Sequence, residues 1–325
     1  MLEILSATDT GLVRSQNEDS YGAAETPNGT LCVVCDGMGG HAGGATASKI
    51  ATDCIIQSIS KEIYPDIRQA LKEALEFANM QVLGAAAEHP ELQGMGTTAC
   101  VLLVQDKQAW IAHAGDSRIY LYVASEKRLY RLTKDHSYVQ GLVDQGIIYA
   151  EEAEMHPDKN RIVKALGIKE TLNPEIPDKP VLPARGDIFL VCSDGLSGMV
   201  SDKEMEKILA GNTDIKAKKT ALMKAAKTAG GMDNITFQLV IITGSPHRKS
   251  IFSGYSMSRQ CGMSEKKHNI RNTLILAAII AVSVLAGIWI GSKGKSQPED
   301  SSKIENANNL IPCDSTPKNQ ENQNN

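Results

Sequence analysis

The sequence lacks a general excess of positive charge. Its 325 residues include 34 Lys and Arg against 38 Asp and Glu, for a formal net charge of −4. A chain without a basic surplus has no electrostatic signature of a nucleic-acid-binding protein, so we expect no nucleic-acid partner. The sequence also contains no Gly-x4-Gly-Lys-[Ser/Thr] loop, which leaves nucleotide binding of that type without support.

Its seven cysteines do not form a disulfide framework. Five of them lie in apolar runs and are typical of small core residues: Cys32, Cys35, Cys54, Cys100 and Cys192. Cys32 and Cys35 have the redox-motif spacing Cys-x-x-Cys, but in a strand-like run positions i and i+3 point to opposite faces. We therefore disfavour a redox or zinc site and expect a reducing compartment.

Charge is distributed unevenly along the chain. Residues 1–245 carry a net −8, residues 246–295 a net +7, and residues 296–325 a net −3. The C-terminal residues are rich in Asn, Gln and Ser and have hardly any apolar content. This pattern predicts an acidic domain over 1–245, a basic juxtamembrane linker over 246–272, and a polar disordered tail over 292–325.

A charge-free apolar stretch, Thr273–Gly291, lies between the linker and the tail. As a helix it would be roughly 28 Å long, close to the ~30 Å hydrocarbon layer of a bilayer. We predict a single transmembrane helix over 273–291. A buried core helix is the weaker alternative, because nothing after this segment could form a core around it. No signal peptide opens the chain, and the basic excess before the segment predicts a cytoplasmic 1–245 domain and an external tail.

Apolar patterns within residues 1–245 predict both strands and helices. Strand-like runs occupy Leu5–Thr8, Leu31–Cys35, Val101–Val104, Ile119–Val123, Ile188–Cys192 and Phe237–Ile242. Helical spacing predicts helices over 50–59, 67–82, 203–209 and 215–228. Strict alternation of strand and helix is missing, so we expect an α+β fold in which helices cover packed antiparallel sheets.

Aspartates recur in one sequence context. Each follows or adjoins an apolar strand and stands beside glycine or another turn-forming residue: Asp36, Asp116, Asp194 and Asp233. Gathered together, such carboxylates would repel one another unless a cation neutralised them, and all-oxygen ligand sets suit Mg²⁺ or Mn²⁺. One Asp-Gly pair would be an ordinary turn. The repetition of this context at four positions predicts a metal site, but it does not identify the reaction.

Seven short motifs carry a family resemblance. They are Arg14-Ser-Gln-Asn-Glu-Asp19, Val34-Cys-Asp-Gly-Met-Gly-Gly-His41, Gly96-Thr-Thr98, Ala114-Gly-Asp-Ser-Arg118, Leu132-Thr-Lys-Asp-His136, Ser193-Asp-Gly195 and Asp233-Asn-Ile-Thr236. With these motifs in this order over residues 8–242, the chain closely resembles the metal-dependent Ser/Thr protein phosphatases of the PPM (type 2C) family, bacterial branch. The resemblance implies an α–β–β–α sandwich of two antiparallel sheets flanked by helices.

The resemblance also implies a role for each acidic residue. Asp36 would bridge two metal ions, with the Gly37 carbonyl on one of them. Asp194 and Asp233 would hold the other ion, and Asp116 would help to bind a third, weaker one. The implied cofactors are two Mn²⁺ or Mg²⁺ ions, with room for a third.

Four further residues receive roles in the same way. Glu18 and Asp19 would act through metal-bound water, and Arg14 would clamp the substrate phosphate. Asn234 would steady the site beside Asp233; its alternative is a turn residue or helix cap. In the implied reaction, a metal-bridging hydroxide attacks phosphorus in line, without a phosphoenzyme. The Cys-x5-Arg loop of the cysteine phosphatases is accordingly missing.

The expected substrates are proteins phosphorylated on Ser or Thr, and the expected counterpart is a bacterial Ser/Thr kinase. One alternative is a catalytically inactive scaffold that binds phosphoproteins. It is disfavoured because the three principal aspartates are all present. A second is a phosphatase for a membrane-proximal regulator such as an anti-sigma antagonist, but no sensory domain is evident.

Two features depart from the family pattern or extend it. Met38 stands where many eukaryotic members have a histidine proposed as general acid, so we expect the leaving group to take its proton from a metal-bound water near Asp116. His41 and His136 are expected to be structural.

Residues 145–166 look irregular and polar and match the family's flap, which would suit recognition of protein segments.

Overall fold

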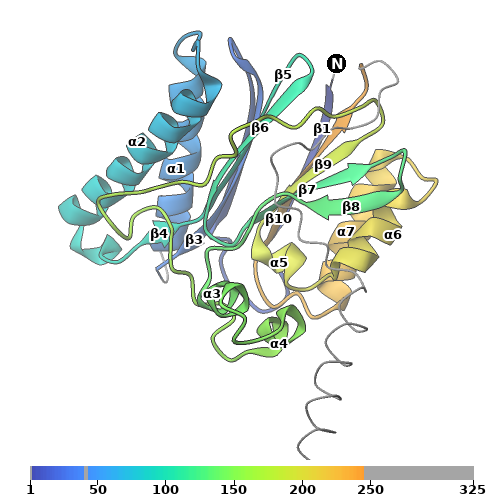
Figure 1. Ribbon diagram of the computed structural model, residues 1–325. Coiled ribbons are helices and arrows are strands. Elements are labelled where there is room, and N and C mark those ends of the chain that lie inside the picture. The colour runs from blue at the N-terminus through green and yellow to red at the C-terminus, as the bar shows by residue number, and fades with distance from the viewer. Residues whose placement is uncertain (1, 40–42, 245–325) are drawn as a thin grey trace, which may run out of the picture. The chain divides into compact units, whose positions relative to one another are not determined.

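The structure is a computed structural model that describes residues 2–39 and 43–244 (Figure 1). Its centre consists of two antiparallel sheets. The first, here the β1 sheet, has the strand order β1 (Leu2–Asp9), β10 (Ile235–Ile242), β9 (Ile188–Cys192), β7 (Arg118–Val123), β8 (Arg128–Arg131). The second, here the β3 sheet, has the order β2 (Asp19–Thr26), β3 (Gly29–Met38), β5 (Ala99–Gln105), β6 (Gln108–Ala114), with β4 (Gly96–Thr97) paired to β3.

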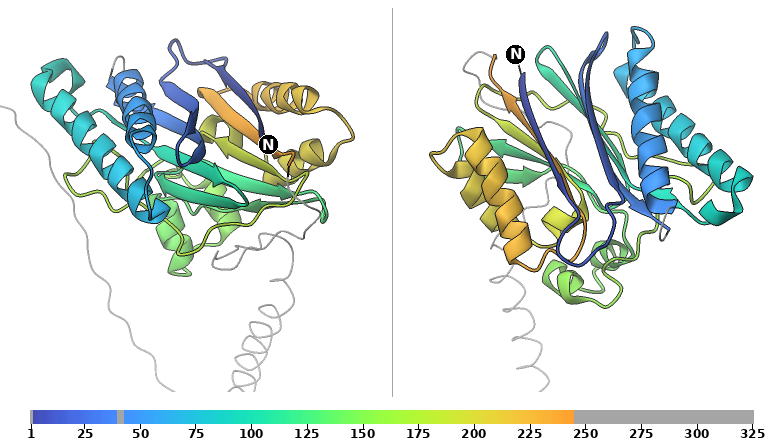
Figure 2. Two further views of the ribbon diagram at one scale, coloured as in Figure 1. Left: turned by 90° about the horizontal axis from the view of Figure 1, so that it is seen from above. Right: turned by 180° about the vertical axis from the view of Figure 1, so that it is seen from behind.

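Helices cover the outer face of each sheet (Figure 2). The β3 sheet packs against α1 (Gly43–Ser60) and α2 (Ile67–Glu88), and a 3₁₀ turn, η1 (Pro90–Leu92), follows α2. The β1 sheet packs against α5 (Asp194–Ser197), α6 (Asp202–Ala210) and α7 (Ile215–Thr228). Two short helices, α3 (Tyr138–Asp144) and α4 (Ala150–Met155), lie in the connection from β8 to β9. The predicted α–β–β–α sandwich is thereby confirmed for the described residues.

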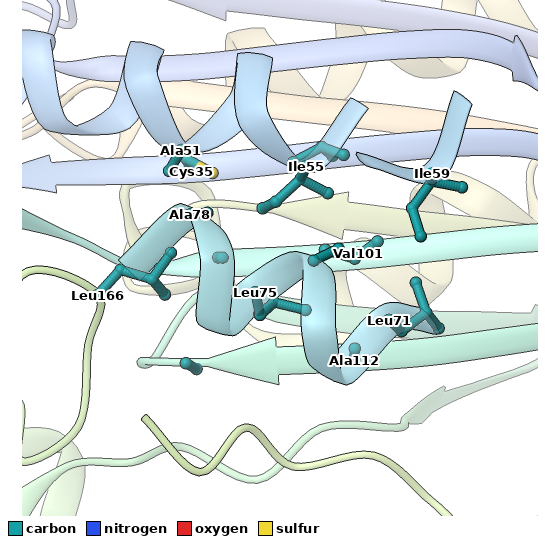
Figure 3. Packing of buried hydrophobic residues seen from close by; sticks show 14 of the residues in the cluster. Cys35, Ala51, Ile55, Ile59, Leu71, Leu75, Ala78, Val101, Ala112 and Leu166 are labelled. Atoms are coloured by element: carbon teal, nitrogen blue, oxygen red, sulfur yellow. The ribbon is translucent and has the colours of Figure 1, made fainter. Parts of the chain in front are cut away.

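Helical periodicity explains the contact of α1 and α2 with the β3 sheet. Residues Ala51, Ile55 and Ile59 recur every four positions along α1, and Leu71 and Leu75 do so along α2. Figure 3 shows these side chains gathered over the sheet, and all of them are buried. Burying one such Leu or Ile stabilises the fold by roughly 1.5–3 kcal/mol, so this stripe holds both helices in place.

The two faces of β3 belong to different cores. Cys35 lies in the core beneath α1 and α2, whereas Cys32 lies in the core between the sheets. Burial raises the pKa of each thiol to about 12, which keeps both protonated and unreactive. The prediction that the Cys-x-x-Cys pair faces two ways and fills core space is confirmed.

Other elements differ from the sequence prediction. The predicted strands and helices are all present, but β2, β4, β6, β8, η1, α3, α4 and α5 were not predicted. The flap, residues 145–166, was predicted to be irregular and contains α4. In β2, Gly22 lies where a Cβ would come within 2.4 Å of Ile56 of α1, so this strand uses small residues instead of an apolar run.

None of the helices among the described residues is long and apolar enough to cross a membrane. The predicted transmembrane helix over 273–291, the linker over 246–272 and the tail over 292–325 lie outside the described residues, as does His41. These expectations therefore stay predictions.

Candidate active site

Loops and strand ends from both sheets meet at one cavity of about 470 Å³. Asp36 comes from β3, Asp116 from the β6–β7 loop, Asp194 from the first turn of α5, and Asp233 from the turn before β10. The cavity is lined by Arg14, Ser15, Gln16, Glu18, Asp36, Gly37, Met38, Gly39, Asp116, Asn160, Ile162, Asp194 and Asp233. The structure thus brings together carboxylates that are up to 215 positions apart in the sequence.

The backbone around Asp36 is fixed from two sides. Its N–H donates to the Thr98 hydroxyl at 2.9 Å, and the Thr97 hydroxyl donates to its carbonyl at 2.9 Å. At the next position a Cβ would lie 2.1 Å from the Gly44 carbonyl oxygen, so only glycine fits at Gly37. This close approach places the start of α1 against the end of β3 and leaves the Asp36 carboxylate facing the cavity.

Four carboxyl groups in this region have raised pKa values. Burial is the main cause, and repulsion from neighbouring carboxylates adds to it. The pKa is raised to about 7 for Asp19 and to about 8 for Asp116, and it also rises for Asp36 and Asp194. The Asp116 Oδ1 is buried and has no hydrogen-bond partner among the described residues. Oxygen ligands under this mutual repulsion fit divalent cations such as Mn²⁺ or Mg²⁺.

Arg14 supplies positive charge at the rim of the cavity. Its Nη2 donates to the Asp233 carboxylate at 2.7 Å, and about half of the Arg14 side chain is exposed. Asn234 holds the loop that carries it: its Nδ2 donates to the carbonyls of Thr10 and Gln16 at 3.0 and 2.8 Å. A planar, partly exposed guanidinium is well shaped for a phosphate.

The remaining predicted residues lie beside the cavity. The Asn234 Oδ1 accepts from the Glu18 N–H at 2.8 Å, and Asp19 is paired with Asp36 across β2 and β3. Ser193, to which the sequence prediction gave no role, donates its hydroxyl hydrogen to Asp19 at 2.8 Å. Thr98 was missed as well. Both stand within quoted motifs, which was the available signal.

A second group of possible metal ligands lies beside the β6–β7 loop, whose Gly115 contacts His136. Atoms of His113, His136 and Glu175 lie within 4.8 Å of one another. The two imidazole rings are stacked, with centroids 4.6 Å apart and planes within 2° of parallel. In parallel rings the nitrogen lone pairs do not converge on one point, so this group is a hydrogen-bond network and not a metal centre.

Comparison with known proteins identifies the family. The family model described as protein phosphatase 2C matches residues 13–233. The chain belongs to this family. It is 37% identical over 243 residues to protein phosphatase PhpP of Streptococcus pneumoniae, covering 74% of this chain and 97% of that protein. It is also 37% identical over 239 residues to the serine/threonine phosphatase stp of Listeria monocytogenes, covering 72% of this chain and 93% of that protein.

Solved structures agree with this assignment. The serine/threonine phosphatase Stp1 of Staphylococcus aureus is similar with a TM-score of 0.70 and 37% identity, over 75% of this chain and 96% of that one. The catalytic domain of PstP, solved with two manganese ions, is similar with a TM-score of 0.66 and 33% identity, over 75% and 99%. The chain is therefore a metal-dependent protein Ser/Thr phosphatase of the PPM family.

Proposed function

We propose that the carboxylate cavity hydrolyses phosphoserine and phosphothreonine in proteins, with two Mn²⁺ or Mg²⁺ ions and a weaker third ion at Asp116. The observation that carries this proposal is the cluster of carboxyl groups with raised pKa values beside a partly exposed arginine. A phosphate dianion would be repelled by such a cluster unless cations were bound there.

The ions would be held by the side chains of Asp36, Asp194, Asp233 and Asp116 and by the Gly37 carbonyl. Ions held there would supply neutralisation of the local negative charge and a water molecule of lowered pKa as the nucleophile for in-line attack on phosphorus, without a phosphoenzyme. Residues Glu18 and Asp19 lie beside these ligands and would act on them through water.

The protein's own side chains bind and orient the substrate. Arg14 would exchange part of its contact with Asp233 for the phosphate oxygens. Met38 lines the cavity but has no proton to give, so the leaving alkoxide would take its proton from water near Asp116. Asn160 and Ile162 of the flap also line the cavity, and they would contact protein segments beside the phosphorylated residue.

Hydrolysis of matched peptides tests this function. The full-length protein should release phosphate from phosphoserine and phosphothreonine peptides only with Mn²⁺ or Mg²⁺ present. Arg14→Ala should chiefly raise KM, because its contact with phosphate already exists in the bound substrate. Full activity in EDTA would contradict the metal-dependent mechanism. A strong preference for phosphotyrosine would contradict the substrate class.

We further propose that the protein is anchored in the cell membrane by residues 273–291, with its phosphatase domain in the cytoplasm opposing a Ser/Thr kinase. Support comes from the uncharged apolar stretch and the basic residues before it. Arginine at the bilayer centre costs roughly 2.5–3.5 kcal/mol per residue. Replacing Ile280 and Val282 by Arg should therefore release the protein to the soluble fraction. The same change at Asn308 and Asn309 of the tail should not, and a wild type found in the soluble fraction would contradict the anchor.

A further inference from the structure

The position of the Asp116 carboxylate depends on the backbone before it. Because its Oδ1 has no hydrogen-bond partner among the described residues, no side chain holds that oxygen in place. The preceding Gly115 has φ +114°, and a Cβ there would lie 2.5 Å from Cγ2 of Thr98. This conformation is open to glycine and strained for other residues. Whatever fixes the Gly115 backbone therefore also sets the point from which the Asp116 side chain extends into the cavity.

His136 holds Gly115 through two hydrogen bonds. The Gly115 N–H donates to the Nδ1 of His136 at 3.1 Å, and the His136 N–H donates to the Gly115 carbonyl at 3.0 Å. An accepting Nδ1 carries no hydrogen, so the neutral ring has its hydrogen on Nε2. That Nε2–H faces the Glu175 carboxylate, with Oε2 at 3.2 Å. The hydrogen bonds thus select one tautomer and one ring orientation.

The His136 ring is supported from behind by His113. His113 is buried, and its Nε2 donates to the Lys134 carbonyl at 2.8 Å. Burial lowers the pKa of His113 to about 4, so the stacked ring stays neutral. The backbones of His113 and Glu175 exchange two hydrogen bonds, at 3.0 and 2.9 Å. The stack and the carboxylate therefore belong to one rigid unit at the end of β6.

His136 also contacts the flap. The Val163 N–H donates to the His136 carbonyl at 2.8 Å. Nζ of Lys164 lies 3.3 Å from Nε2, but both groups are donors in this tautomer, so the backbone bond to Val163 makes the link. The residue before Val163, Ile162, lines the cavity. One histidine therefore joins the loop that carries Asp116 to the segment that faces the substrate.

We propose that His136 is a positioning residue that sets the Asp116 carboxylate for a divalent cation and fixes the flap to the same loop. This inference rests on the proposed function, because it takes Asp116 to be an ion ligand. His136 does not act as general acid: its Nδ1 accepts from backbone, its Nε2 faces Glu175, and it is not among the residues that line the cavity.

Matched variants of the full-length protein test the proposal. His136→Asn places an oxygen where Nδ1 lies and can still accept from Gly115, whereas His136→Gln places its amide near Nε2 and cannot. Mn²⁺ binding, followed by the electron paramagnetic resonance signal of free Mn²⁺, should weaken about 10-fold or more at the weakest site in His136→Ala and His136→Gln. His136→Asn should keep most of the affinity. Binding of the tighter ions should change little.

A double mutant separates positioning from general loss of structure. If His136 acts through Asp116, then His136→Ala should cause no further loss of Mn²⁺ affinity in an Asp116→Asn protein. The half-exposed Glu175→Ala variant, which spares the fold, should show a smaller loss at the same ion site. Three results would overturn the proposal. They are equal Mn²⁺ affinities for His136→Asn and His136→Gln, the same loss of Mn²⁺ affinity from His136→Ala in the Asp116→Asn protein as in the wild type, and unchanged Mn²⁺ binding in Glu175→Ala. A wild type that neither binds Mn²⁺ nor hydrolyses phosphopeptides would overturn the proposed function itself.

Discussion

Two groups of charged side chains lie close together in this fold, and their electrostatics are opposite. In the active site, Asp36, Asp116 and Asp194 have raised pKa values, chiefly through burial. In the second group, the Arg118 guanidinium donates to both oxygens of Asp135, from Nε to Oδ1 at 3.1 Å and from Nη2 to Oδ2 at 2.7 Å, and Arg131 pairs with the same carboxylate. Burial alone would raise the pKa of Asp135. The charge of the neighbouring Arg118 guanidinium outweighs burial, and the pKa is lowered.

The two groups differ in the source of the positive charge that compensates their carboxylates. For Asp135 the chain supplies two guanidiniums, and this network extends through Tyr120 to Asp202. Among the described residues, Arg14 is the one guanidinium that lines the carboxylate cavity, and it contacts Asp233 at the rim. The charge of Arg118 also lowers the pKa of Asp116 and Asp194, but burial outweighs it. Uncompensated carboxylates destabilise a fold, and such groups cluster at functional sites. The comparison therefore separates a structural ion network from a site that uses external cations.

The largest effect is expected from Asp36→Asn. A direct ligand to two ions should matter more than an indirect contact, so phosphopeptide hydrolysis should fall by more than about 100-fold. The same variant should unfold at a higher temperature than the wild type in EDTA, because it removes a carboxyl group whose charged form is disfavoured by burial and by its neighbours. A fall in both activity and metal-free stability would contradict the view that Asp36 is retained for the ions alone.

A stability loss without loss of metal binding is expected from Asp135→Asn. Leaving Arg118 and Arg131 without their carboxylate should lower the free energy of unfolding by about 3–5 kcal/mol, measured by urea denaturation. Asp144→Asn is a matched control, because Asp144 pairs with Lys134 on the surface at 2.6 Å. That variant should change stability by less than about 1 kcal/mol. Equal effects would show that the buried network is no stronger than a surface pair.

A smaller effect is expected when pH is varied without metal. The folded-state pKa of Asp19 is raised to about 7 and that of Asp116 to about 8. In the unfolded chain the pKa of an aspartate is about 3.9. The stability that these two groups contribute is therefore complete below about pH 3.9 and is lost as the pH rises through 7 to 8. The pKa of Asp135 is lowered, so its contribution is lost only in acid.

Thermal unfolding in EDTA should therefore show stability falling between about pH 5 and pH 8. Asp116→Asn should flatten this slope, and Asp135→Asn should leave it in place. A metal-free protein whose stability rises over this range would contradict the assigned directions.

Sequence reasoning predicted most of the buried framework. Predicted and observed bounds coincide for Ile188–Cys192 and for 215–228, where a continuous apolar run or a clear helical period leaves little choice. It missed β8, which is short and carries charge at both ends, and β2, which depends on small residues beneath α1. These strands exist because of their neighbours and not because of their own composition.

The same limit applies to the site. The carboxylates were recognisable because each aspartate stands beside a strand and a turn-forming residue. The partners that hold them were not, because these contacts join distant positions: Ser193 binds Asp19 across 174 residues, and His136 binds Gly115 across 21. Hydrogen bonds of this kind depend on the packing of the two sheets, which no local pattern encodes.

Proton release on metal binding tests the central claim most directly. If the cavity carboxyls are partly protonated until cations bind, Mn²⁺ must displace protons. Titration calorimetry of the full-length protein in buffers of different ionisation enthalpy should show release of about one proton or more near pH 6.5, falling toward zero near pH 9. Asp116→Asn should reduce the release. Tight Mn²⁺ binding without proton release near pH 6.5 would show that the carboxylates are already ionised and would contradict the account.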